Sequence, residues 1–225
     1  MAEQNRNSKL KSSIVGFLSV LWDLILLNFL WLLCSLPVLT IGPATSALFS
    51  VTIKLARDDD VQTLQDFFRA LKGNFRQAFV LGLVFLFAAA VIFSDGVYAF
   101  SVDGPAKIVF GLLTGFLCAL LLTYFSYVFA LSARYENRWL SQIINAYLLA
   151  FCAPGKTVLM WIIYLAPAAL LLLLPAQAAA YTGFLYLMMG VSGPVLLGSM
   201  VLIQIFERFA PNKNAQERET DEHES

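Results

Sequence analysis

The amino-acid sequence predicts an all-α protein: a polytopic helical membrane bundle of five regular transmembrane helices, one short broken or re-entrant helix, and interfacial amphipathic helices. Two observations support this fold class. Of the 225 residues, 59% are apolar and 13% are charged, against roughly 45–50% and about 25% in soluble domains. Uncharged runs such as 157–206 and 108–133 also exceed the roughly 10–14 residues expected of a buried helix in a soluble protein.

The first apolar run predicts a span at residues 14–36 and then an interrupted return at 37–56. Pro37 and Pro43 interrupt the helical pattern, because proline lacks a backbone N–H and disfavours helix in the residue before it. About 13 helical residues reach only about 20 Å, short of the roughly 30 Å hydrocarbon core. We therefore expect the non-helical backbone near Pro37 to lie inside the bundle or beside a water-filled cavity.

The rest of the chain predicts two helical hairpins. The first contains spans at 78–100 and 108–133, joined through an Asp-Gly-Pro turn. The second contains spans at 157–174 and 183–206, joined by a turn from Pro175 to Gly183. Residues 1–206 form one transmembrane domain in this interpretation. The tail at 207–225 is too polar to pack and is expected to be disordered.

Two connecting segments, 61–75 and 138–152, have the pattern of amphipathic helices lying in the membrane interface. In the first, acidic residues precede an apolar face and basic residues close it, as the helix dipole favours. Its apolar face either anchors the helix against the headgroups or serves as a docking surface for a cytoplasmic partner. The candidate docking residues are Asp66, Phe67, Phe68, Asn74 and Phe75.

The placement of basic residues predicts the orientation, because Lys and Arg accumulate on the cytoplasmic side of membranes. If the element at 37–56 returns across the bilayer, 14 of the 15 Lys and Arg fall on one side, and only Lys107 falls on the other. Topologies without the return place the basic residues of the 54–76 connection outside or split the remainder. We therefore expect a multi-pass protein with both termini in the cytoplasm.

Asp23 is the principal candidate for a functional residue within a span, since a carboxylate near the middle of a bilayer is costly. It continues a stripe of small or polar residues, Ser12, Gly16 and Ser19, of the kind that lets membrane helices pack closely. Asp23 is thus either a neutral packing residue, a substrate or proton site, or a shallow residue of an interfacial helix. The further candidates for function or packing are Asn28, Pro37, Thr40, Gly42, Pro43 and Thr45.

The sequence lacks the residues and motifs that several kinds of catalytic or binding site require. The single histidine, His223, lies in the tail, and no nucleotide-binding or hydrolase motif is present. We therefore expect no catalytic, cofactor or metal site, and no enzyme. A net charge of zero also provides no basic surface for nucleic acid.

Three segments of the sequence carry a family resemblance: Asn28-Phe-Leu-Trp31, the segment from Leu36 to Thr45, and the segment from Asp66 to Phe75. They resemble the YesL-like family of bacterial membrane proteins, which is classed as a domain of unknown function. The resemblance implies a location in the bacterial cell (inner) membrane and brings no catalytic residues. The family's genes often neighbour carbohydrate uptake systems of the ATP-binding-cassette type, which implies an accessory role in sugar import.

Three functions follow as hypotheses. The chain is an accessory or regulatory subunit associated with carbohydrate uptake by an ATP-binding-cassette system. Alternatively, it is a small secondary transporter or channel with a path near the broken helix and Asp23, or a membrane structural or assembly factor. The expected partners are the lipid bilayer, transporter subunits and further copies of the same chain.

Overall fold

A computed structural model describes residues 2–57, 59–101, 103–134, 139–173 and 176–209. Every regular element in these ranges is helical. In chain order the elements are α1 (Ala2–Cys34), the 3-10 turn η1 (Val38–Thr40), α2 (Ile41–Leu55), α3 (Thr63–Gly73), α4 (Phe75–Ser101), α5 (Pro105–Arg134), α6 (Trp139–Cys152), α7 (Pro154–Leu173), α8 (Ala176–Met189) and α9 (Ser192–Phe209).

Three segments of the described chain are long and apolar enough to cross a membrane on their own: η1 with α2, α4, and α5. Two bent pairs bring the number to five if each pair is one span. Helices α6 and α7 meet at 105°, and α8 and α9 meet at 57°. In α1 the apolar part is the shorter stretch Leu18–Cys34. These helices indicate a protein of the lipid bilayer.

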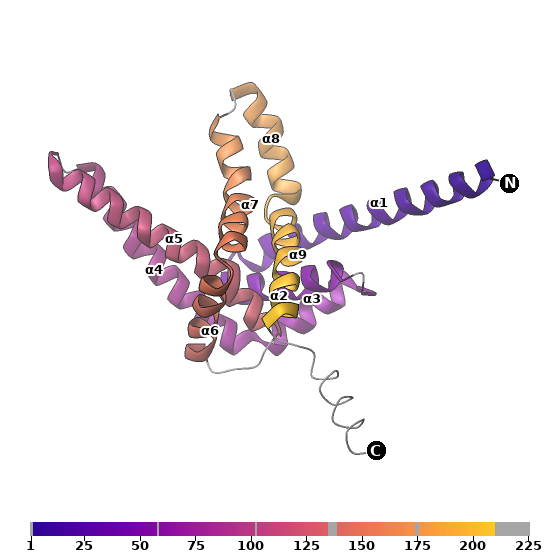
Figure 1. The fold of residues 1–225 in the computed structure, drawn as a ribbon, viewed down its shortest axis with the longest axis horizontal. Coiled ribbons are helices and arrows are strands. Elements are labelled where there is room, and N and C mark those ends of the chain that lie inside the picture. The colour runs from indigo at the N-terminus through magenta and orange to yellow at the C-terminus, as the bar shows by residue number, and fades with distance from the viewer. Residues whose placement is uncertain (1, 58, 102, 135–138, 174–175, 210–225) are drawn as a thin grey trace, which may run out of the picture.

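The helices diverge from a common base in three arms, formed by α1, the α4–α5 hairpin and the α7–α8 hairpin (Figure 1). The sides of these arms are apolar and open. On α4, for example, Phe87, Phe93 and Phe100 are 74%, 75% and 85% exposed. Water would make such surfaces unfavourable, whereas lipid chains solvate them at no cost.

Helix α2 lies at the centre of the base and contacts α1, α3, α4, α5 and α9. Eleven of its fifteen residues are buried, and several of its hydroxyls bond to other helices. The hydroxyls of Ser46 and Ser132 lie 2.8 Å apart, and those of Thr52 and Ser199 lie 2.9 Å apart. Small residues let neighbouring helices approach closely in membranes, so this short helix is the main core element of the fold.

The break before α2 is closed by local hydrogen bonds. The Thr40 hydroxyl lies 2.6 Å from the Cys34 carbonyl oxygen and 2.7 Å from that of Pro37, so it satisfies backbone groups at the end of α1. Two residues later α2 crosses α4 backbone to backbone. A Cβ built on Gly42 would lie 2.6 Å from the Gly82 Cα, closer than atoms can approach. Glycine is therefore required at this crossing.

The second hairpin differs from its prediction. Residues 176–183, expected to form a turn, are the first turns of α8, because an alanine-rich stretch strongly favours helix. The interruption lies further along, at Gly190 and Val191. Pro194 follows it in the first turn of α9, where a missing N–H is tolerated. The expected tail begins inside α9, which ends at Phe209, and the positions from 210 onward lie outside the described residues.

Candidate functional site

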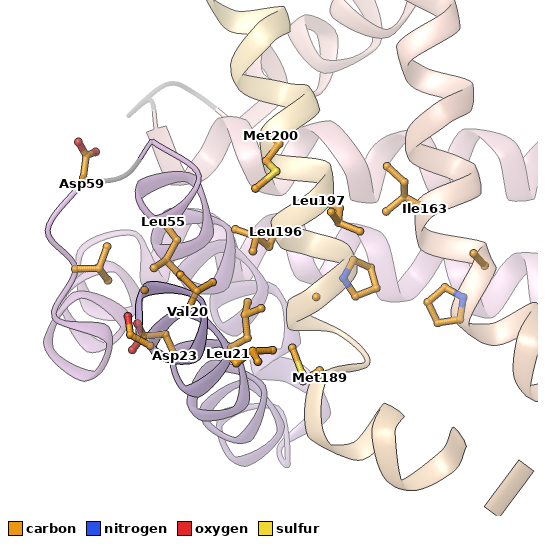
Figure 2. A pocket seen from close by; sticks show the side chains of 18 of the residues that line it. Val20, Leu21, Asp23, Leu55, Asp59, Ile163, Met189, Leu196, Leu197 and Met200 are labelled. Atoms are coloured by element: carbon orange, nitrogen blue, oxygen red, sulfur yellow. The ribbon is translucent and has the colours of Figure 1, made fainter. Parts of the chain in front are cut away.

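A groove with a volume of about 1090 Å³ lies between α1, α7 and α9, beside the last turn of α2. We call it the Asp23 groove. Figure 2 shows Asp23 and Asp59 toward the end of α2, with Met189, Leu197 and Ile163 along the rest of the wall. The side chains that give the groove its shape are Gly16, Ser19 and Asp23 from α1, Ala166 and Pro167 from α7, and Gly193, Pro194 and Leu197 from α9.

Several of the residues that line the groove are small and stand among larger apolar side chains. Gly16, Ser19 and Asp23 follow one another at helical spacings of three and four, so they lie on one face of α1. A Cβ built on Gly16 or on Gly193 would meet nothing within 4 Å. Both glycines therefore face open space, and the groove is not closed by side chains from the described part of the chain.

Asp23 marks the polar end of the groove. Its Oδ1 accepts a hydrogen bond of 2.7 Å from the hydroxyl of Thr63, the buried first residue of α3. Leu55, in the last turn of α2, and the exposed Asp59 line the same end. Asp23 thus lies beside the end of α2 and not beside its middle.

Asn28 joins α1 to the break between α8 and α9. Its Nδ2 donates to the Leu187 carbonyl oxygen at 2.7 Å, and its Oδ1 accepts from the backbone N–H groups of Val191 and Ser192 at 3.1 and 3.2 Å. The Ser192 hydroxyl in turn donates to the Leu24 carbonyl at 2.8 Å. One buried side chain therefore satisfies backbone groups on both sides of the broken helix.

The other candidate residues on the N-terminal part of the chain lie elsewhere. Thr40 and Gly42 act at the break before α2, as described above. Pro43 and Thr45 are buried, and the Thr45 hydroxyl accepts a 3.1 Å hydrogen bond from Nε1 of Trp31. None of the residues from Pro37 to Thr45 lines the Asp23 groove. The structure thus separates Asp23 from the break with which the sequence had associated it.

The five candidate docking residues around α3 do not form one open surface. Phe67 is fully buried and Asp66 is buried, while Asn74 is half-buried at the end of the helix. Only Phe68 and Phe75, which are 40% and 42% exposed, remain available to another molecule.

Asp66 instead holds α3 to the end of α2. Its Oδ1 lies 3.0 Å from Lys54 Nζ and 3.4 Å from an Arg69 nitrogen, and its Oδ2 accepts from the Gln62 backbone N–H at 3.2 Å. Burial opposes ionisation of this carboxyl. The hydrogen bonds from Lys54 and Gln62, with the charges of Lys54 and Arg69, outweigh burial and hold the pKa of Asp66 below its usual value.

Sequence reasoning missed Gly82, Ser132 and Ser199, each of which contacts α2. Small residues inside long apolar helices were the available signal, but such residues are frequent in every span of this chain. Across the described ranges, no three His, Cys, Asp or Glu side chains come close enough to share a metal ion.

Two comparisons with known proteins give a match to part of this chain. A family model described as "Protein of unknown function, DUF624" matches residues 24–96, which include Asn28, α2 and α3 but not α7 or α9. The uncharacterized protein YesL of Bacillus subtilis is 30% identical over 138 residues, which cover 60% of this chain and 65% of the relative. No solved structure matches. Residues 24–96 of this chain are thus similar to a family of unknown function, and the chain spans less than two thirds of the length of the YesL protein that it matches.

Proposed function

We propose that this protein is a non-enzymatic accessory subunit of the membrane, which receives a transmembrane helix of a partner protein in the Asp23 groove. The observation that carries the proposal is the groove itself. It is mostly apolar and open to the surface, and its walls include the small residues Gly16, Ala166 and Gly193 among larger apolar side chains. Small-residue faces of this kind are what closely packed membrane helices use as interfaces.

The size of the groove fits such an occupant. Two turns of an α-helix about 10 Å across fill on the order of 850 Å³, and the groove measures about 1090 Å³. At its polar end Asp23 accepts a hydrogen bond from Thr63 at Oδ1, and its carboxylate oxygens have lone pairs for further donors. A hydrogen-bond donor on the partner helix would bind there, as polar groups often do between membrane helices.

The partner that the family resemblance suggests is a carbohydrate importer of the ATP-binding-cassette type. This part of the proposal rests on the gene neighbourhood of the family. The groove supports a helical partner of any membrane system, so the experiment must identify the partner without assuming it.

A photo-crosslinking residue at Leu197 tests the proposal. Leu197 lines the groove and is 52% exposed. The control position is Phe100, which is 85% exposed at the end of α4. In native membranes we expect crosslinks to a specific transmembrane segment from position 197 and not from position 100. Crosslinks to lipid alone from position 197 would refute a helical occupant.

A variant that fills the groove provides a second test of the proposal. Gly193→Leu adds a side chain where the structure has open space, so the fold should survive while the partner is displaced. Gly111→Leu is the matched control, since Gly111 also faces open space but does not line the groove. We expect loss of the crosslink with the first variant and its retention with the second.

A secondary transporter is the second candidate, because Asp23 and the first turn of α9 line one groove and transporters often bind solutes at broken helices. In such proteins the free N–H groups of the broken helix bind the substrate. Here Asn28 already occupies the N–H groups of Val191 and Ser192, which favours the accessory role. Uptake of sugars and ions by reconstituted vesicles that falls with Asp23→Asn would reverse this preference. An assembly factor without a solute path predicts crosslinks but no change in the partner's transport activity.

A further inference from the structure

The outward side of α3 and the first turn of α4 carry exposed apolar and basic residues. Leu64, Phe68 and Phe75 are 48%, 40% and 42% exposed. Lys72 and Arg76 are exposed beside them, and within the described residues neither forms an ion pair with a carboxylate. The opposite side of the helix, centred on Phe67, is packed into the core. The exposed side is therefore not used by the fold.

The chain itself keeps this surface at the membrane. Asn74 is the single residue between α3 and α4, and α4 is a 27-residue apolar helix able to cross a bilayer. At the other end, a short connection joins α3 to α2. The salt bridge between Asp66 and Lys54 ties the middle of α3 to the last turn of α2. An element held at both ends to spans lies in or next to the headgroup layer.

We propose that the junction between α3 and α4 binds anionic phospholipid headgroups, with Lys72 and Arg76 at the lipid phosphates and Leu64, Phe68 and Phe75 among the upper acyl chains. The charge is polarised along the segment. Asp59 and Asp60 precede α3 together with one exposed cation, Arg57, whereas Lys72 and Arg76 lie near its end. Anionic lipid is attracted to the basic end and repelled from the acidic end, so the site has a definite position on the surface.

Membrane lipid is a better occupant than a soluble acidic partner. The three exposed apolar side chains lie beside the cations, and headgroup-layer helices combine these two features. Basic residues near a surface of anionic lipid each contribute about 1 kcal/mol, which corresponds to about a fivefold preference.

The test measures lipid preference at α3 in the full-length protein. The native cysteines Cys34, Cys118 and Cys152 are changed to serine, and a fluorophore is attached to Gln65→Cys, an exposed position of α3. Quenching by brominated phosphatidylglycerol is compared with quenching by brominated phosphatidylcholine in reconstituted vesicles. The ratio of the two gives the relative association constant of anionic lipid at this site.

We expect a ratio clearly above one that falls as salt is added, since salt screens exposed charges. The double variant Lys72→Gln/Arg76→Gln should lower the ratio by up to about 25-fold, or about fivefold per cation. Lys72→Arg/Arg76→Lys keeps both charges and should keep the ratio, which separates charge loss from misfolding. Lys107→Gln removes an exposed cation at the start of α5 and should change nothing. A wild-type ratio of one, or a ratio unaffected by the Gln variant, would overturn the proposal.

Discussion

Replacing Asn28 should loosen the junction between α8 and α9 more than any other single polar substitution in α1. Asn28→Leu keeps a side chain of similar volume but removes the donor to Leu187 and the acceptor for Val191 and Ser192. Asn28 is 1% exposed, so water does not replace these bonds without opening the structure.

The magnitude follows from the three hydrogen bonds, which measure 2.7, 3.1 and 3.2 Å. Side-chain hydrogen bonds between membrane helices average about 0.6 kcal/mol and reach about 1.7 kcal/mol. The unpaired backbone groups left behind add a desolvation cost. We expect Asn28→Leu to lower the free energy of unfolding by about 2–3 kcal/mol.

The assay is equilibrium unfolding in mixed micelles with increasing sodium dodecyl sulfate, followed by tryptophan fluorescence. The control is Ser94→Ala, because the Ser94 hydroxyl is exposed and bonds only within its own helix, to Ala90. That variant should stay within about 0.5 kcal/mol of the wild type. If the free energy of unfolding of Asn28→Leu also stays within that margin, Asn28 does not hold α8 and α9 together at the break. The bonds from Val191 and Ser192 to Asn28 then no longer favour the accessory role over a transporter.

Gly42→Ala should lower the free energy of unfolding by about 1–3 kcal/mol or more, because the new Cβ would collide with the backbone of α4. Gly111→Ala is the control and should be neutral, because Gly111 faces open space. Unfolding in sodium dodecyl sulfate measures both variants. The Asp66 carboxyl has a lowered pKa in the folded protein, so its stabilising contribution is present above its unfolded value near 3.8 and is lost as the pH falls through the folded value. Asp66→Asn should therefore remove part of the pH dependence of the unfolding midpoint below about pH 4, and an unchanged acid profile would contradict the role of this ion pair. For the predicted orientation, a cysteine that replaces Lys107 should react with an impermeant maleimide in intact cells, while one that replaces Gln65 should react only after lysis. The reverse pattern would show that the basic residues were assigned to the wrong side of the membrane.

The sequence determined the class of this protein and the position of its principal interruption. Long uncharged runs require helices in lipid, since no other local structure satisfies backbone groups there. Pro37 required a break because proline lacks the N–H that would continue the helix, and Pro43 suits the first turn of the helix that follows. The structure places a 3-10 turn and the start of α2 there. The family resemblance, drawn from the same N-terminal segments, agrees with the match over residues 24–96.

Only the tertiary structure decided which polar residues meet. Asn28 finds its partners about 160 residues further along the chain, and no local pattern encodes so distant a contact. Gly42 is required because α4 crosses it at Gly82, although most glycines of this chain look alike in sequence. Asp66 and Phe67 were expected on an exposed docking surface, but both are buried because α3 packs against α2.

Asp23 shows what the sequence determines and what only the tertiary structure determines. Its charge within an apolar run was visible in the sequence and marked it as unusual. Its bond to Thr63 depends on where α3 packs against α1, and the groove around it depends on where α7 and α9 lie relative to α1. The sequence thus determines which segments leave water, since burial in lipid is a local property of composition. The site depends on helix packing, which is a property of the whole chain.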